Sequence, residues 1–442
     1  MEQENALPAT MPGTDAKERR RGIVVHSRWM WWLLTFLFVI GPGLIVMVAD
    51  NDAGAVSTYI QAGAQYGTRL LWLLLLLWPM TYFIQEMVVR LGIATGKGHA
   101  AMIFERFGRW WGYFSLADLE LVNFLTLVTE FAAIALAVQH LGISPYLGVP
   151  FAAAGLIIMV LTGSYLHWEH TVLVLCSLDL GWFWIAFKLR PGIGEVLHNT
   201  FVPGIPVGGL TGNLVFLVIA IVGTTIAPWQ LFFQQSCIAD KKLRFSEINS
   251  ERLDTFVGGC VTITVAACMM VAGNYALRHG VHFDDPAQMS DALRPLVGNG
   301  IRMAILVLMI NAAVLGSTTI SLASAWAYGE MRGWPHSLQL PFREAKGFYV
   351  IYLACVALAA GIVLIPRAPL QLIILGVQVL AGIMLPSAII FLQLLLNDKE
   401  LLGDYVNKPW NNLVNWIIII VLFALSLVLA AQVIAPNLFP SA

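Results

Sequence analysis

Charged residues are scarce in this chain of 442 residues: 12% are Asp, Glu, Lys or Arg, while 58% are hydrophobic. Soluble domains carry roughly 25% charged residues, so the composition excludes an ordinary water-soluble domain. The charges are also spaced to leave uncharged runs of about 20 residues, the length that an α-helix needs to cross a bilayer. With a mean hydropathy of +0.76, these runs predict an all-α polytopic membrane protein.

Several motifs are missing as well, and each absence removes a class of protein. The five cysteines show no Cys-x-x-Cys spacing, which argues against a disulfide framework or a zinc site. No phosphate-binding glycine loop is found, so we do not expect an ATP-driven pump. Nucleic-acid-binding patterns are absent too. We therefore expect neither an enzyme nor a bound cofactor, and a lipid bilayer rather than a nucleic acid as the partner.

Eleven hydrophobic segments are predicted to cross the membrane. Their approximate limits are 30–65, 70–93, 112–138, 147–166, 170–188, 211–236, 254–276, 299–328, 348–364, 370–396 and 413–435. Lys and Arg lie mainly on one side of these segments, eighteen against seven, and the richer side is normally cytoplasmic. The N-terminus is therefore expected in the cytoplasm and the C-terminus outside. We expect no cleavable signal peptide in the first 29 residues, and a bacterial inner membrane is the simplest expected location.

The eleven segments divide into five, five and one. Because each half has an odd number of helices, the second half is inverted relative to the first. The predicted parts are a cytoplasmic tail (1–29), a first repeat (30–200), a second repeat (201–398), and a loop with the eleventh helix (399–442). Both halves begin with an interrupted segment, "ADNDAGA" in the first and "GTTIAPWQ" in the second. Such a matching pair indicates a transport site near the middle of the membrane.

The first interruption places Asp50, Asn51 and Asp52 deep in an apolar segment. A carboxylate at that depth is costly unless it is paired, hydrated or bound to a cation. Gly54 and its small neighbours permit an unwound stretch, whose free carbonyl groups also attract a cation. The alternative is a helix end at the membrane surface with a hydrated carboxylate. The apolar stretch before Asp50 is too short to span the membrane, which favours the broken helix.

Two further features supply oxygen ligands. Pro228 removes a backbone donor, so a carbonyl near Thr224 loses its helical partner and becomes available to a hard cation. An ordinary proline kink is the alternative. Glu120 and Glu130 lie within the segment 112–138, where few cationic residues could neutralise them. Weaker candidates are Asp179, Glu86, Gln378 and Asn311, of which the last two are more typical of hydrogen bonds between helices.

These residues resemble the Nramp family of divalent metal transporters. The similarity is most specific in "GPG" (41–43), "IQAGAQYG" (60–67), "LLW" (70–72), "RLGIATGKG" (90–98) and "EFAAIALA" (130–137). It implies a LeuT-type fold of two inverted five-helix repeats with the first and sixth helices broken. Three departures matter: Ala55 replaces a family asparagine, Ala227 replaces a methionine, and Trp229 replaces a histidine. A second family histidine aligns with Gln234, and Leu127 takes the place of one acidic residue.

These departures point to the magnesium-transporting branch of that family. Replacing the thioether with a methyl group removes a soft ligand, and the added volume suits a partly hydrated Mg²⁺. The expected metal-binding residues are Asp52, Thr224 through its carbonyl, Glu130, Ala227 and Gln230, and the expected lining residues are Ala49, Asn51, Ala55, Trp229 and Gln378. The expected activity is facilitated transport of Mg²⁺ and Mn²⁺ without strong proton coupling, by a protein for which a monomer is plausible.

Three alternatives stay open. A proton-coupled Mn²⁺ or Fe²⁺ symporter would use the retained Glu130. A sodium-coupled amino-acid transporter could share the fold, although the acidic first interruption argues against a carboxylate substrate. The third alternative is a membrane sensor that transports nothing; long soluble extensions would favour it, and the sequence shows none.

Overall fold

The computed structural model describes residues 41–206, 209, 211–366 and 369–434, and all regular elements within these ranges are helices. The first is a pair, α2 (Pro42–Ala49) and α3 (Ala53–Tyr66), separated by three residues. The others are α4 (Leu71–Thr95), α5 (His99–Phe107), α6 (Arg109–His140), α7 (Pro145–Leu161), α8 (Tyr165–Leu178), α9 (Gly181–Leu189), α10 (Ile193–Phe201), α11 (Gly212–Thr225), α12 (Pro228–Lys241), α13 (Ile248–Arg278), α14 (Pro286–Arg332), α15 (Lys346–Val363), α16 (Leu370–Leu395), α17 (Lys399–Leu402) and α18 (Pro409–Ile434).

The prediction of an all-α membrane protein is confirmed. Within the described ranges, nine helical segments are long and apolar enough to cross a membrane, counting α8 with α9 and α11 with α12 as one each. The apolar helix α7 is shorter, and α2 with α3 covers the described part of the first expected segment. Residues 30–40 of that segment, the tail 1–29 and the end of the last segment lie outside the described residues. Eleven crossings, the inverted repeat and the domain limits therefore stay predictions.

Both expected interruptions occur. The first separates α2 from α3 at residues 50–52, and the second separates α11 from α12 at Ile226 and Ala227. The second has a simple cause, because Pro228 is the first residue of α12 and cannot donate a hydrogen bond into α11.

The structure also contains interruptions and short helices that the sequence did not predict. The segment 170–188 is divided at Asp179 and Leu180 into α8 and α9. The helix expected from residue 299 begins at Pro286, and it bends at Gly298, whose φ of 83° is outside helical values. The helices α5 and α10 were missed because each has only nine residues, too few to register as an apolar membrane segment.

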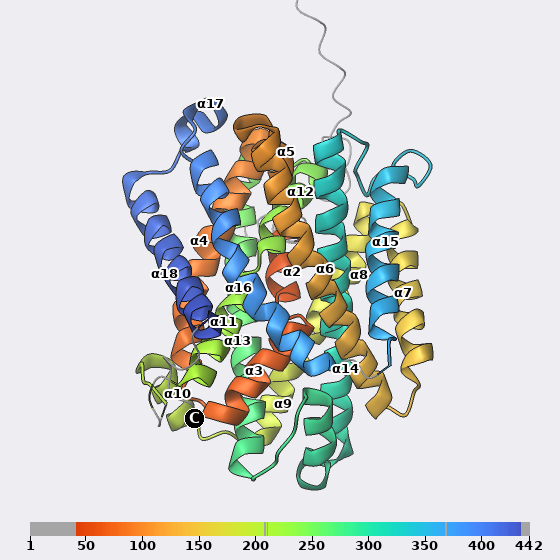
Figure 1. The fold of residues 1–442 in the computed structure, drawn as a ribbon, viewed down its shortest axis with the longest axis vertical. Helices are drawn as coiled ribbons and strands as arrows, with labels where there is room; N and C mark the ends of the chain where they lie inside the picture. The colour runs from red at the N-terminus through yellow and green to blue at the C-terminus, as the bar shows by residue number, and fades with distance from the viewer. Residues whose placement is uncertain (1–40, 207–208, 210, 367–368, 435–442) are drawn as a thin grey trace, which may run out of the picture. The chain divides into compact units, whose positions relative to one another are not determined.

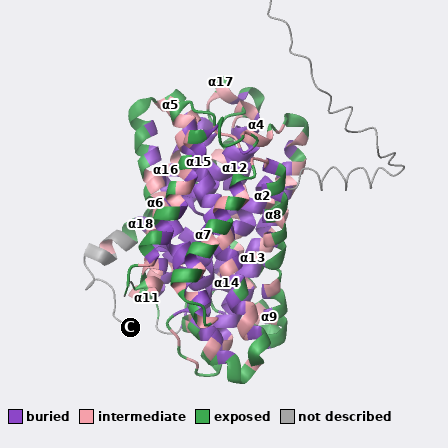
Figure 2. Ribbon diagram, turned by 90° about the vertical axis from the view of Figure 1, so that its right-hand side faces the viewer, coloured by how far each residue is buried: buried purple, intermediate pink, exposed green. Residues whose placement is uncertain are grey.

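Buried residues fill the interior of the helical bundle, and exposed residues cover its sides (Figure 2). Many of the exposed side chains are large and apolar, such as Phe151 in α7, Phe187 in α9 and Ile420 in α18. Exposed apolar side chains around the periphery are expected where lipid replaces water as the solvent. Figure 1 shows α5 and α17 at one end of the bundle and α10 at the other.

Helices α3 and α13 approach so closely that their backbones touch. A Cβ atom on Gly63 would lie 2.0 Å from the carbonyl oxygen of Met270, and one on Gly273 would lie 2.0 Å from that of Ile60. Each helix therefore needs a glycine where the other helix crosses it. In membranes, where hydrophobic burial between helices supplies no driving force, such small-residue contacts are a main source of helix association.

Candidate metal site at the helix breaks

The two helix breaks lie side by side. The Asp50 carboxylate, at the end of α2, accepts a hydrogen bond from the side-chain amide of Gln230 in the first turn of α12. In the second turn of α3, the hydroxyl group of Tyr59 lies 2.8 Å from that of Thr225, the last residue of α11. Residues from the two halves of the chain therefore form one site.

Asp52 and Glu130 meet at the beginning of α3. The Asp52 side chain caps this helix, because its Oδ1 atom accepts a hydrogen bond of 2.8 Å from the backbone N–H of Ala55. Glu130, in α6, accepts a bond of 3.1 Å from the N–H of Ala53. Helix N-termini carry a partial positive charge and unpaired N–H groups, which stabilise carboxylates that no basic side chain neutralises.

Gly316 in α14 lies directly against both carboxylates. A Cβ atom there would be 2.7 Å from Cδ of Glu130 and 3.0 Å from Cβ of Asp52. The two acidic side chains are thus packed within one small region, which sequence spacing could not show because they are 78 residues apart.

Thr224 is buried near the end of α11. Its carbonyl group would pair with the N–H of residue 228 in a continuous helix, but that residue is proline. Its hydroxyl group is buried without a hydrogen-bond partner among the described residues. Both oxygens of Thr224 are consistent with the predicted ligand role.

Small residues border the two breaks. Ala49, Ala55 and Ala227 are all buried there, the first at the end of α2, the second in the first turn of α3 and the third just before α12. Gln378 of α16 reaches the same region, since a Cβ atom on Gly54 would lie 1.7 Å from its Nε2 atom. Gln378 therefore lies beside the first break, and its part in a metal site stays a prediction.

Two expected lining residues make other contacts. The amide of Asn51 donates a hydrogen bond of 3.2 Å to the carbonyl group of Thr262 in α13, which fixes the break against that helix. Trp229 is fully buried and packs edge-to-face on Phe233, with ring centroids 6.2 Å apart. Phe233 in turn contacts Trp168 and Trp326. We assign Trp229 to this aromatic cluster.

Several unpartnered polar atoms lie at the breaks. Within the described part of the chain, no hydrogen-bond partner is found for six buried atoms there: Asp50 Oδ2, Asn51 Oδ1, Glu130 Oε1, Thr224 Oγ1, Trp229 Nε1 and Gln378 Nε2. Buried polar groups are nearly always paired, so several unpaired ones in one place suggest an absent ligand. Four of the six are oxygens, the donor atoms that hard divalent cations prefer.

The weaker candidates have structural partners. Glu86 forms ion pairs with Arg90 and Arg252. Asp179 accepts a 2.8 Å hydrogen bond from Asn311, which ties α14 to the break between α8 and α9. Glu120, which the sequence analysis considered together with Glu130, interacts with Ser324 of α14, and one of its buried carboxylate oxygens has no hydrogen-bond partner among the described residues. The sequence analysis missed Gln85, which donates a 3.1 Å bond to Gln230, because nothing in its apolar surroundings marks it.

A family model described as natural resistance-associated macrophage protein-like, or Nramp, matches residues 43–432. The chain belongs to the Nramp family. Nramp proteins are membrane transporters, so this chain is a transporter and not an enzyme.

Nramp relatives match along almost the whole chain. The divalent metal cation transporter MntH of Staphylococcus saprophyticus is 27% identical over 438 residues, covering 93% of this chain and 94% of its own. MntH of Latilactobacillus sakei is 26% identical over 453 residues, covering 96% and 95%. A crystal structure of the manganese transporter of Eremococcus coleocola aligns with a TM-score of 0.77 at 20% identity, covering 95% of this chain and 91% of that chain. This likeness establishes the Nramp fold.

A second buried carboxylate explains the GPG motif of this Nramp protein. Asp254 of α13 accepts hydrogen bonds from the N–H groups of Gly41, Gly43 and Leu44, at 2.9 to 3.1 Å. A Cβ atom on Gly43 would lie 2.5 Å from the hydroxyl oxygen of Thr255. The glycines therefore let the start of α2 approach Asp254 closely.

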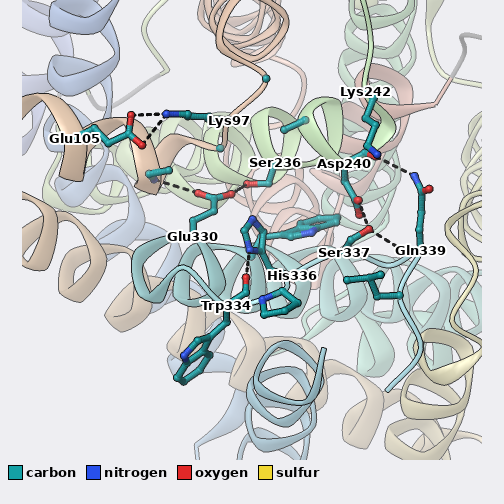
Figure 3. Close-up of a pocket in the computed structure, with 17 residues that line it drawn as sticks. Lys97, Glu105, Ser236, Asp240, Lys242, Glu330, Trp334, His336, Ser337 and Gln339 are labelled. Atoms are coloured by element: carbon teal, nitrogen blue, oxygen red, sulfur yellow. Dashed lines mark hydrogen bonds and ion pairs between the residues drawn. The ribbon is translucent and has the colours of Figure 1, made fainter. Parts of the chain in front are cut away.

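The Nramp chain also has a pocket of about 570 Å³ between the ends of α4, α12 and α14 (Figure 3). Its acidic side chains are already paired: Glu105 with Lys97, Glu330 with Ser236, and Asp240 with the N–H of Leu338. The lining residues include none of those predicted to bind metal. We therefore place the candidate metal site at the breaks rather than in this pocket.

Proposed function

We propose that the protein carries Mg²⁺ and Mn²⁺ across a cell membrane by facilitated transport. The supporting observation is the pairing of Asp52 and Glu130 beside unpartnered oxygens where the two broken helices meet. These carboxylate, hydroxyl and carbonyl oxygens match a divalent cation that prefers oxygen ligands. The relatives named above support a divalent metal as the substrate: two are divalent metal cation transporters, and the solved one is a manganese transporter.

The preference for Mg²⁺ follows from the residues around the carboxylates. Mg²⁺ gives up its water reluctantly and usually keeps several water molecules while it contacts one or two carboxylates. Ala55 and Ala227 carry only methyl groups where the family has asparagine and methionine, and we propose that this difference in size leaves space for such water. Because neither supplies a sulfur or amide ligand, softer transition metals gain no extra affinity. We place the protein in the magnesium-transporting branch of the family on this basis.

Membrane voltage is sufficient to drive this transport. A potential of 100 mV, negative inside, is worth about 2.3 kcal/mol per charge, or about 4.6 kcal/mol for a divalent cation entering the cell. In the orientation proposed from the basic residues, with the N-terminus inside and the C-terminus outside, no coupled proton is required for accumulation. We propose a monomer as the transporting unit.

A proton-coupled Mn²⁺ or Fe²⁺ symporter is the second candidate. The adjacent carboxyl groups of Asp52 and Glu130 favour it, because two acidic groups in contact can share a proton that a cation would displace. The solved relative is a manganese transporter, which fits this candidate equally well.

Flux into proteoliposomes distinguishes the two. The purified protein is reconstituted with separate dyes for internal Mg²⁺ and internal pH, and a K⁺ gradient with valinomycin sets the voltage. We expect Mg²⁺ entry that increases with negative internal voltage and produces no acidification. Mn²⁺ entry with acidification and without Mg²⁺ entry would contradict the proposal and support the proton-coupled symporter.

Restoring the two family ligands should change the selectivity. In the double variant Ala55→Asn, Ala227→Met, the amide and thioether fill the space for water and supply donors that Mn²⁺ accepts better than Mg²⁺. We expect the ratio of Mn²⁺ to Mg²⁺ transport efficiency to rise by about tenfold, the effect of roughly 1.4 kcal/mol. The matched control is Ala49→Ser, which adds only a hydroxyl group beside the same break. An unchanged ratio in the double variant would refute the argument from pocket size.

A further inference from the structure

Asp50 is the second carboxylate of the first break, and the proposed function has not used it. Its side chain is buried at the end of α2, where only 1% of the residue is exposed. Its Oδ1 atom accepts the hydrogen bond from Gln230. Gln230 is itself oriented by Gln85, whose amide donates to its Oε1 atom at 3.1 Å, so that the Gln230 amide nitrogen is directed at Asp50. One carboxylate oxygen is thus fixed by a chain of two glutamines.

The other oxygen of Asp50 is not used by the fold. Among the described residues, Oδ2 is buried and has no hydrogen-bond partner. The buried basic groups Arg90 and Lys241 are paired elsewhere, with Glu86 and Glu169. A half-paired carboxylate in a membrane protein is costly, which points to a positively charged or hydrogen-donating occupant beside Oδ2.

The position of Asp50 suits a contact through water. Its Cα atom is two residues from that of Asp52, at most about 7 Å away. A cation on Asp52 holds water oxygens at about 2.1 Å, and a hydrogen bond adds about 2.8 Å. A carboxylate roughly 5 Å from the cation therefore accepts a hydrogen bond from its bound water rather than touching the metal.

We infer that Asp50 accepts a hydrogen bond from a water molecule bound to the cation at Asp52, and that Gln230 fixes the carboxylate for this contact. Asp50 is thereby a specificity-determining residue that favours the ion which keeps its water. Mg²⁺ retains its water more firmly than Mn²⁺, so it gains more from this contact. The inference rests on the proposed transport of both ions.

The test compares KM for Mg²⁺ and for Mn²⁺ in proteoliposomes, together with Tm of the purified protein. For Asp50→Asn we expect KM for Mg²⁺ to rise about tenfold and KM for Mn²⁺ only about threefold, because the neutral amide accepts a hydrogen bond from metal-bound water less strongly. Gln230→Leu should change the ratio in the same direction, since the carboxylate is then no longer fixed. Gln234→Leu is the matched control: its amide lies one turn further along α12 and donates to Thr255.

The outcomes separate the inference from the function on which it rests. If Asp50→Asn lowers Tm but leaves the ratio of the two KM values unchanged, the bond between Asp50 and Gln230 only stabilises the fold, and the inference is overturned. Transport of both ions by the wild-type protein would still support the proposed function in that case. If the wild-type protein transports neither ion, both the inference about Asp50 and the proposed function are wrong. If Asp50→Asn does not fold, Asp50→Glu is tested instead, because its longer side chain displaces the carboxylate while keeping the charge. A changed ratio of KM for Mg²⁺ to KM for Mn²⁺ supports the inference, and an unchanged ratio overturns it.

Discussion

Replacing Asp52 with asparagine is expected to abolish uptake of both Mg²⁺ and Mn²⁺ while leaving the protein folded. Removing one partner of a desolvated charge pair costs about 3 kcal/mol or more, which lowers transport efficiency by about a hundredfold. The side-chain oxygen of asparagine can still accept the hydrogen bond from the N–H of Ala55, so the cap of α3 is preserved. The measurement is initial flux in proteoliposomes, with Tm recorded on the same preparation.

Asp52→Ala provides the comparison. It removes the charge and the cap together, so uptake should be lost and stability should fall by about 1 kcal/mol. If Asp52→Asn kept wild-type uptake while Asp52→Ala lost it, Asp52 would be a helix cap alone, and the proposed metal site would be wrong.

Replacing Asp254 with alanine is expected to produce the largest loss of stability. Three backbone N–H groups at the start of α2 lose their acceptor at once. Leaving buried donors unpaired costs about 1 to 3 kcal/mol each, so a total of about 3 kcal/mol is expected even if water reaches some of them. The measurement is Tm in detergent, which should fall by several degrees.

The same variant should release the start of α2. A cysteine introduced at Leu44 reports on this, and maleimide labelling of Leu44→Cys should become faster when Asp254→Ala is added. Asp254→Asn is the control, since its remaining carbonyl oxygen still accepts hydrogen bonds and both effects should be smaller. If Leu44→Cys is labelled at the same rate with and without Asp254→Ala, Asp254 does not anchor α2.

Much of the fold could be predicted because membrane helices appear in the sequence as long apolar runs. The two interruptions at residues 50–52 and 226–227 were also predictable, from acidic residues in one and Pro228 in the other. The bend at Gly298 and the break at Asp179 were not predictable in the same way. A glycine or an aspartate within a helix leaves the chain several conformations, and packing against neighbouring helices selects one of them.

The candidate site, too, could be predicted from the sequence only in part. Asp52 and Glu130 were identifiable because a carboxylate in an apolar segment is costly and needs a reason. Their packing against Gly316 and the bond between Asp50 and Gln230 join residues that are far apart in the chain, so they depend on tertiary structure. The packing of the Trp229 ring on Phe233 likewise depends on tertiary structure, and the sequence did not show it.

The backbone contact between α3 and α13 constrains how such a protein can move. With Gly63 against Met270 and Gly273 against Ile60, neither helix can rotate past the other without a collision. The pair must therefore move as a single rigid body. Helix α2 moves with it, because Asp254 of α13 holds the start of α2 and Thr262 of α13 holds Asn51 in the break that follows. A change of conformation in such a transporter would then have to come from the other helices moving around this three-helix unit, which carries Asp52 as a fixed part.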